Sequence, residues 1–277
     1  MTTWEFLVAI ILGFVEGLTE FAPVSSTGHM IIVDDLWLKS KQLFNEEVAV
    51  TFKVVIQLGS ILAVVIIFKD RILNMLHLGK KTSYTANENR LKLSHIFVGI
   101  VPAGIIGFLF EDYIDENLFR TETVIIGLFV GAILMIIADR YNKKKKHVTE
   151  SVDNISYKQA LGMGFFQCIG LWPGFSRSGS TISGGVLLGL SHRASADFTF
   201  IMAVPVMAGA SGLSLIKNWQ YFTMDALPFM IVGFISAFIF ALISIQFFLK
   251  LIDRVKLVPF AIYRMIIAVL IYVLYFL

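Results

Sequence analysis

Within a long apolar region near the N-terminus, residues 4–33, stands the sequence Glu16-Gly-Leu-Thr-Glu20-Phe-Ala-Pro-Val-Ser-Ser-Thr-Gly-His29. Its second half, residues 21–29, is polar and contains Pro and Gly, so it interrupts any helix long enough to cross a bilayer. Backbone groups left unpaired at membrane depth are tolerated only where protein buries them or water reaches them. We therefore predict a re-entrant helix–loop–helix hairpin with its break at residues 21–29, in preference to an ordinary loop between two short helices.

A second break interrupts the apolar region at residues 159–190. It reads Trp172-Pro-Gly-Phe-Ser-Arg-Ser-Gly-Ser-Thr181 and, like the first, concentrates polar and reactive side chains where a membrane span would otherwise lie. Pro23-x-x-Ser26 in the first break and Pro173-x-x-Ser176 in the second occupy the same position within their hairpins. The sequence therefore predicts two matching hairpins that meet near the middle of the membrane.

The composition of the whole chain fits this interpretation. Of 277 residues, 57% are hydrophobic and 16% are charged, whereas about 25% of the residues in a soluble domain are charged. The mean hydropathy is +0.78. These values exclude a soluble globular enzyme and a disordered chain, and they indicate a polytopic membrane protein. The net charge of +3 gives no sign of nucleic-acid binding, and the single cysteine, Cys168, allows no disulfide within the chain.

Six further stretches are long and apolar enough to cross a bilayer, which takes roughly 20 residues. They are residues 48–68, 93–110, 123–138, 198–216, 228–249 and 259–277. Basic residues gather in residues 69–92 and 139–158 and in a third turn around Arg254, while residues 111–122 are acidic. Because basic loops stay in the cytoplasm, the acidic loop and both termini are expected outside the cell.

This orientation inserts the two hairpins from opposite sides of the membrane, and three spans follow each hairpin. The predicted fold is an all-α polytopic membrane protein with six transmembrane helices and two re-entrant hairpins in an inverted-topology repeat. We expect a single integral membrane domain, residues 1–277. Repeat one covers about 1–138, a cytoplasmic loop covers 139–158, and repeat two covers about 159–277.

Two carboxylates in the first hairpin are the strongest chemical signal. Glu16 and Glu20 are four residues apart, so their side chains project from one face of a helix. Ionisable groups inside a bilayer are costly and usually mark function. The pair could hold a hard divalent cation, Mg²⁺ or Ca²⁺, or it could share a proton and act as a general base.

Hydroxyl groups and a histidine follow the two carboxylates. These residues are Ser25, Ser26, Thr27 and His29. Hydroxyls donate hydrogen bonds to anions, and histidine titrates near neutral pH. We therefore expect the first break to carry catalytic groups.

The second break resembles a cradle for a phosphate group. Arg177 supplies a planar guanidinium that binds phosphate in a bidentate manner, and Gly174 allows the backbone to approach a ligand closely. The hydroxyls of Ser176, Ser178 and Thr181 add further donors. The sequence therefore predicts an anion-binding site in this break.

Four further candidate residues outside the breaks are Gln57, Arg264, His192 and Arg193. Gln57, in the middle of a predicted span, either orients a site residue or bonds to a neighbouring helix. Arg264, in the last span, either reaches an acidic group or extends to the membrane interface. His192 and Arg193 are expected in a solvated cytoplasmic turn.

Both breaks, in this order, closely resemble the motifs of the bacterial undecaprenyl-diphosphatase family, also called bacitracin-resistance proteins. The resemblance extends over essentially the whole chain. It includes Val55-Ile-Gln-Leu-Gly-Ser60 and Pro259-Phe-Ala-Ile-Tyr-Arg264. It implies six spans, two re-entrant hairpins and an inverted repeat in the bacterial plasma membrane, with a site open to the outer face.

The resemblance also implies an activity and residue roles. The family removes the terminal phosphate of undecaprenyl diphosphate and so returns the lipid carrier to cell-wall synthesis. Glu16 and Glu20 would take the carboxylate roles, and Ser26 and His29 the catalytic-loop roles. The diphosphate would be bound by Ser25, Thr27, Gly174, Ser176, Arg177, Ser178 and Thr181, with Gln57 and Arg264 in support.

Several alternatives stay open at the level of sequence. The nucleophile is Ser26, His29 or a water molecule activated by Glu20. The rival function is a secondary transporter or flippase for an anionic isoprenoid phosphate, in which the glutamates carry a coupling proton. Small residues around Gly209 would permit the close helix contact of a homodimer.

Overall fold

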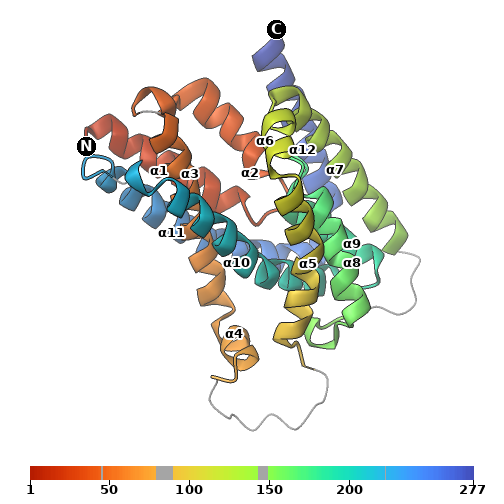
Figure 1. Ribbon diagram of the computed structural model, residues 1–277. Helices are drawn as coiled ribbons and strands as arrows, with labels where there is room; N and C mark the ends of the chain where they lie inside the picture. The colour runs from red at the N-terminus through yellow and green to blue at the C-terminus, as the bar shows by residue number, and fades with distance from the viewer. Residues whose placement is uncertain (45, 79–89, 143–148, 222) are drawn as a thin grey trace.

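The computed structural model of the chain describes residues 1–44, 46–78, 90–142, 149–221 and 223–277 (Figure 1). Over these residues the chain is helical, with no strand beyond a single bridge between Thr149 and Leu190. The α-helices are α1 (Thr3–Thr19), α2 (Ser26–Met30), α3 (Glu46–Ile67), α4 (Lys69–Met75), α5 (Leu93–Leu109), α6 (Glu111–Leu118), α7 (Thr121–Asn142), α8 (Tyr157–Ile169), α9 (Arg177–Leu187), α10 (His192–Lys217), α11 (Leu227–Val255) and α12 (Val258–Phe276). The shorter segments are the π-helix η1 (Ile31–Leu38) and the 3-10 turns η2 (Ser40–Gln42), η3 (Val152–Asn154) and η4 (Trp219–Tyr221). The predicted all-α class is confirmed.

Each of the six predicted spans falls on one long helix, namely α3, α5, α7, α10, α11 or α12. Among the described residues, five helices are long and apolar enough to cross a membrane, and a sixth span results if α5 and α6 count together. The chain bends by 74° between α5 and α6. The acidic segment, expected as a loop, begins with the short helix α6. These helices make the chain a multi-pass membrane protein.

Both predicted breaks separate short helices, and each break ends in the same cap. Ser25 and Ser176 have positive φ angles of 71° and 72°. Their side chains accept the backbone N–H of Gly28 and Gly179, and so they cap α2 and α9. The predicted equivalence of Ser26 with Ser176 is therefore wrong by one residue. The capping serines, Ser25 and Ser176, are the equivalent positions of the two breaks. Pro23 and Pro173 are therefore not equivalent, because they precede these serines by different numbers of residues.

Glycines set the closest helix contacts at the two ends of the bundle. A side chain on Gly13 of α1 would collide with the carbonyl of Gly233 on α11, and one on Gly164 of α8 would collide with the carbonyl of Gly99 on α5. Figure 1 shows α1 with α11 on the left and α8 beside α5 on the right. Without a side chain in the way, the backbones approach closely enough for van der Waals packing to hold the pairs in lipid.

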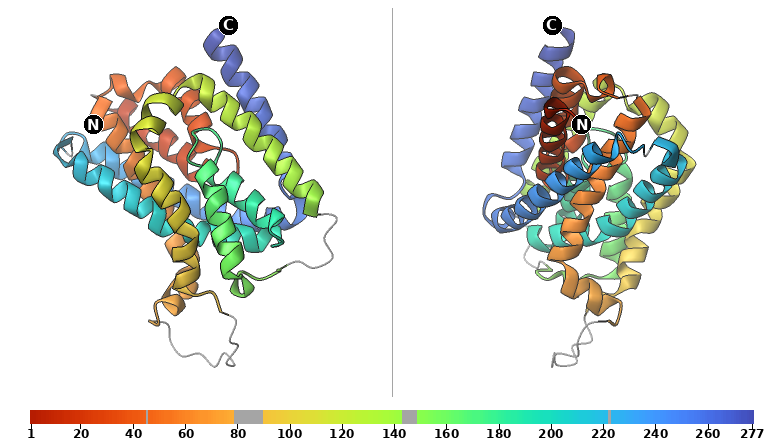
Figure 2. Two further views of the ribbon diagram at one scale, coloured as in Figure 1. Left: turned by 45° about the vertical axis from the view of Figure 1, so that its right-hand side comes forward. Right: turned by 90° about the vertical axis from the view of Figure 1, so that its left-hand side faces the viewer.

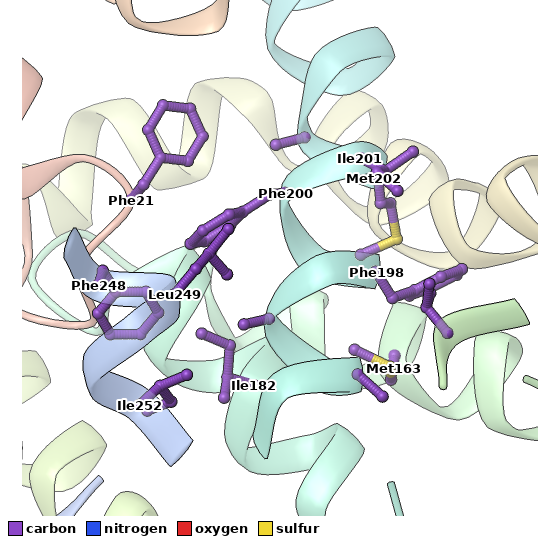
Figure 3. Packing of buried hydrophobic residues seen from close by; sticks show 14 of the residues in the cluster. Phe21, Met163, Ile182, Phe198, Phe200, Ile201, Met202, Phe248, Leu249 and Ile252 are labelled. Atoms are coloured by element: carbon purple, nitrogen blue, oxygen red, sulfur yellow. The ribbon is translucent and has the colours of Figure 1, made fainter. Parts of the chain in front are cut away.

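A chain of aromatic rings joins the first break to three later helices. Phe21, in the break, meets Phe200 of α10 with ring centroids 5.2 Å apart, and Phe200 lies 5.8 Å from Phe248 of α11 (Figure 3). Phe248 in turn meets Phe260 of α12 at 5.4 Å. This packing holds the irregular backbone of the break inside the protein, where its polar groups are protected from lipid.

A buried carboxylate ties the ends of three helices together. Asp139 of α7 lies 2.6 Å from Nε2 of His192 on α10 and accepts the backbone N–H groups of Leu257 and Val258, at the start of α12, at 2.9 Å each. The expectation of a solvated turn is wrong for His192, because helix packing buries its side chain. Arg193 keeps 41% of its side chain exposed while it bonds to Asp197 and to the carbonyl of Leu249.

The remaining parts of the chain lie at its edges. The C-terminal end of α12 projects beyond the other helices in both views of Figure 2. In Figure 1, α4 and α6 lie at opposite ends of the molecule. Lys80, Lys81 and residues 143–146, which contribute to the two predicted basic loops, lie outside the described residues.

Candidate active site

The two breaks meet at the carboxylate of Glu20. Its Oε2 accepts the hydroxyl of Ser26 at 2.7 Å, and its Oε1 pairs with Nη2 of Arg177 at 3.1 Å. The Glu20 side chain is only 9% exposed. A charge-assisted pair in such surroundings holds its partners in fixed positions. The structure therefore brings three predicted site residues into direct contact: Glu20 at the end of α1, Ser26 from the first break and Arg177 from the second.

Arg177 keeps part of its hydrogen-bonding capacity free. Its guanidinium lies 5.8 Å from the ring centre of Phe21, and its side chain is 15% exposed. The nitrogen Nη1 is buried and has no hydrogen-bond partner within the described ranges. Buried polar atoms are rarely left without a partner. The unused N–H groups of Arg177 therefore point to an anionic ligand.

His29 is held at both ring nitrogens. Its Nδ1 lies 2.7 Å from the carbonyl oxygen of Ser25, and its Nε2 lies 2.7 Å from the hydroxyl of Tyr263 on α12. Tyr263 is not among the site residues predicted from the sequence. The available signal was its place directly before Arg264, in the last segment of the family resemblance.

Glu16 lies one helical turn before Glu20 and is buried, with 6% of its surface exposed. Its carboxylate makes no hydrogen bond to any residue that the structure describes. Glu20, Lys53 and Arg177 are the charged groups that interact with it electrostatically. In the predicted carboxylate pair, Glu20 is therefore bonded to Ser26 and Arg177, whereas Glu16 has no hydrogen-bond partner among the described residues.

Lys53 is a second cation that the sequence analysis missed. It lies on α3, and its ammonium group is 2.8 Å from the buried carboxylate of Asp34 and 3.4 Å from Asp35. A lysine within a predicted span was the signal that could have identified it.

The hydroxyls of the second break are occupied by internal hydrogen bonds. Ser176 caps α9, Ser178 donates to the carbonyl of Ala22, and Thr181 donates to the carbonyl of Arg177. The bond from Ser178 links the second break directly to the first. Ser25 likewise caps α2, while Thr27 is half-buried beside it.

Arg264 fastens the second break to α7. It is fully buried, and its Nη2 donates to the carbonyls of Gly174, Phe175 and Gly127 at 2.9, 2.7 and 3.2 Å. Gly174 has a φ of +85°, and a side chain there would collide with Val124 of α7. The expectation that Arg264 reaches an acid or the interface is wrong, because its Nη2 is bonded to backbone carbonyls inside the protein. The missing side chain of Gly174 thus allows the backbone of the break to approach α7, where a ligand had been expected.

Gln57 follows the second of its two predicted alternatives. Its side-chain oxygen accepts the hydroxyl of Ser211 on α10 at 3.2 Å. The bond links α3 to α10, so Gln57 joins neighbouring helices. Across the described part of the chain there is no group of three or more His, Cys, Asp and Glu side chains arranged to hold a metal ion.

Fold and site together define a class of protein: a polytopic helical membrane protein in which two polar breaks join a carboxylate, a serine and an arginine in one buried cluster. The chain matches the family model described as bacitracin resistance protein BacA over residues 9–270. It belongs to this bacitracin-resistance protein family.

Curated relatives cover the chain from end to end. It is 66% identical over 272 residues to an undecaprenyl-diphosphatase of Anoxybacillus flavithermus, with 98% of each chain covered. It is 64% identical over 276 residues to that of Geobacillus kaustophilus, covering 100% of this chain and 99% of the other. With the undecaprenyl-diphosphatase of Bacillus subtilis it shares 65% identity over 271 residues, again covering 98% of each. The family predicted from the motifs is confirmed.

Proposed function

We propose that this site hydrolyses undecaprenyl diphosphate to undecaprenyl phosphate and inorganic phosphate, and so recycles the lipid carrier of cell-wall synthesis. Bacitracin resistance follows, since this activity consumes the diphosphate form of the lipid. The observation that carries the proposal is the contact of Glu20 with both Ser26 and Arg177. The transporter alternative is not favoured, because the relatives are named as diphosphatases.

In this mechanism Arg177 binds and neutralises the phosphoryl oxygens. Its Nη1 has no hydrogen-bond partner among the residues that the structure describes, and electrostatic stabilisation is usually the largest contribution to phosphoryl transfer. The isoprenoid tail stays in the lipid while the diphosphate enters between the two breaks. Arg177 would thus act on charge that develops in the transition state.

Among the three expected nucleophiles, the geometry favours Ser26. Its hydroxyl already donates to Glu20 at 2.7 Å, which is the arrangement of a nucleophile and its base. Oγ of Ser26 would attack the terminal phosphorus, its proton would pass to Glu20, and the bond from phosphorus to the bridging oxygen would break. Water would then hydrolyse the phosphoserine. A phosphorylated enzyme that is trapped in the wild type and absent from Ser26→Ala would support this route, whereas trapping it in Ser26→Ala would contradict it.

A divalent cation, Mg²⁺ or Ca²⁺, forms part of the proposal. Glu16 suits it as the principal protein ligand because its carboxylate has no hydrogen-bond partner among the described residues, and Glu20 would contribute beside it. Mg²⁺ commonly takes one or two carboxylates and completes its shell with water and phosphate oxygens. When bound, the cation would offset diphosphate charge. We expect Mg²⁺ to raise the Tm of the wild type and to leave the Tm of Glu16→Gln unchanged; equal shifts would contradict this assignment.

The inverted repeat is the architecture that we propose around the site. Pairing α1 with α8, α3 with α10, α5 with α11 and α7 with α12 makes several helix contacts of one half correspond to contacts of the other half. The packing of α1 on α11 corresponds to that of α8 on α5, and Gly13 corresponds to Gly164. The matched caps at Ser25 and Ser176 support the same pairing.

In the same alignment, the position of repeat two that is equivalent to Glu16 holds a neutral residue. Gln167 precedes Ser176 by nine residues, as Glu16 precedes Ser25. Gln167 is 1% exposed, and neither polar atom of its side chain has a partner in the described part of the chain. In this architecture only repeat one carries the carboxylates, while repeat two supplies the arginine.

The proposal places the hairpins as re-entrant elements in the bacterial plasma membrane, with the site facing outside. The acidic helix α6 and both chain ends would lie on that outer side. A homodimer would form through α10, where a side chain on Gly209 or Gly212 would meet open space. Purified protein that runs as a monomer in detergent and in lipid nanodiscs would contradict the dimer.

Phosphate release from undecaprenyl diphosphate in detergent tests the activity. We expect the wild type to release phosphate, and Glu20→Ala and Arg177→Ala to lose at least about a hundredfold in rate. Lys250→Ala, an exposed basic residue on α11, is the matched control and should retain wild-type activity. Folded wild-type protein that releases no phosphate, with and without added Mg²⁺, would overturn the proposed function.

A further inference from the structure

Tyr263 faces the reactive edge of His29 from the opposite half of the chain. Its hydroxyl is 2.7 Å from Nε2 of His29, and the two rings stack with centroids 5.6 Å apart and an interplanar angle of 18°. His29 belongs to the first break, whereas Tyr263 lies on α12 next to the buried Arg264. The ring of His29 is therefore placed by a residue 234 positions further along the chain.

The partner on the other side of the imidazole determines which nitrogen carries hydrogen. Nδ1 lies 2.7 Å from the carbonyl oxygen of Ser25, which can only accept, so Nδ1 carries the hydrogen. In neutral His29 the lone pair is then on Nε2, directed at Tyr263. The tyrosine hydroxyl donates to this lone pair, and it can turn to accept if Nε2 becomes protonated.

The surroundings of Tyr263 indicate the side from which a ligand arrives. Tyr263 is 42% exposed, and its neighbours on α12, Ile262 and Ile266, are 51% and 60% exposed. Such a face suits lipid, so a diphosphate carried on an isoprenoid tail would meet Tyr263 before it reaches His29.

We propose that Tyr263 is a positioning residue for the hydrolysis: its hydroxyl fixes the orientation of the His29 ring, with hydrogen on Nδ1 and the lone pair on Nε2. This inference rests on the proposed function. The stacking and the Ser25 bond alone would leave the ring free to tilt, whereas the hydroxyl fixes its second edge. Repeat two thereby orients His29 of repeat one, the residue to which the family resemblance gives a catalytic-loop role.

The first test measures the hydrogen bond itself. Tyr263→Phe keeps the stacked ring and removes only the hydroxyl, and Tyr272→Phe on the same helix is the matched control, since Tyr272 packs against Phe276. Diethylpyrocarbonate modifies unprotonated imidazole nitrogens that are accessible. We expect His29 to be modified several-fold faster in Tyr263→Phe than in the wild type or Tyr272→Phe, as read by mass spectrometry of the His29 peptide. Equal rates would overturn the inference.

The second test measures the consequence for turnover. Loss of one neutral hydrogen bond should lower kcat roughly three- to tenfold, with KM changed by less than about twofold, because Tyr263 acts through His29. Wild-type kcat in Tyr263→Phe, or a change confined to KM, would overturn the positioning role. The modification test needs no turnover, so a wild type that releases no phosphate would count against the proposed function and leave the hydrogen bond measurable.

Discussion

Two arginines of the second half perform opposite tasks within a few ångströms of the same break. Arg177 pairs with one carboxylate, and its Nη1 has no hydrogen-bond partner in the described ranges, whereas Nη2 of Arg264 donates to three backbone carbonyls. The sequence presents both as arginines in apolar surroundings. Their tasks differ because Arg177 begins a helix at the edge of the break, while Arg264 comes from a span packed behind it.

Replacing Arg264 by methionine should destabilise the fold. The substitution keeps an apolar stem of similar length and leaves the carbonyls of Gly174 and Phe175 without their buried donor, at a cost of about 2–5 kcal/mol. We expect a clearly lower Tm in detergent, followed by far-UV circular dichroism, together with loss of phosphatase activity. Lys250→Met, at an exposed position on α11, is the control and should keep the wild-type Tm. An unchanged Tm for Arg264→Met would show that the break holds its shape without this arginine.

Most of the elements could be predicted from the sequence, and the breaks were the most informative part. Apolar length located the six long helices, and Pro, Gly and hydroxyl residues located both breaks. The register between the breaks could not be predicted, because it depends on the backbone conformation of Ser25 and Ser176.

Side-chain partners across the bundle were equally inaccessible to sequence. The contacts of His29 with Tyr263 and of Asp139 with His192 join helices that are far apart in the chain. Local patterns identified Glu20, Ser26 and Arg177 as site residues. No pattern indicated that the carboxylate of Glu20 bonds to both Ser26 and Arg177. Tertiary packing alone determines these pairs.

The glycine contact between α1 and α11 gives a prediction at the scale of elements. A methyl group at Gly13 would collide with the carbonyl of Gly233, so Gly13→Ala should separate the helices and cost about 1–3 kcal/mol. The matched control is Gly209→Ala on α10, where a methyl group meets open space. We expect a lower Tm for Gly13→Ala and an equal or higher Tm for Gly209→Ala, since alanine favours helix. Equal Tm values for the two variants would contradict the close packing.

At the scale of the whole molecule, the proposed orientation predicts which ends a membrane-impermeant reagent reaches. In a Cys168→Ser background, a cysteine introduced at exposed Asp112 of α6 should react with an impermeant maleimide on intact cells. A cysteine at Lys250, on the basic end of α11, should react only after the membrane is permeabilised. Labelling with the reverse pattern would mean that the proposed site faces the cytoplasm.

The long separation between ionic partners has a consequence for biosynthesis. Glu20 pairs with a residue 157 positions later, and Asp139 with groups 53, 118 and 119 positions later. When α7 leaves the ribosome, both acids are present and none of the groups that neutralise them has been made. A chain that stops there leaves Glu20 without Arg177, in surroundings where an unpaired charge is costly. Glu20 therefore acquires its ionic partner only when the second half of the chain has been translated.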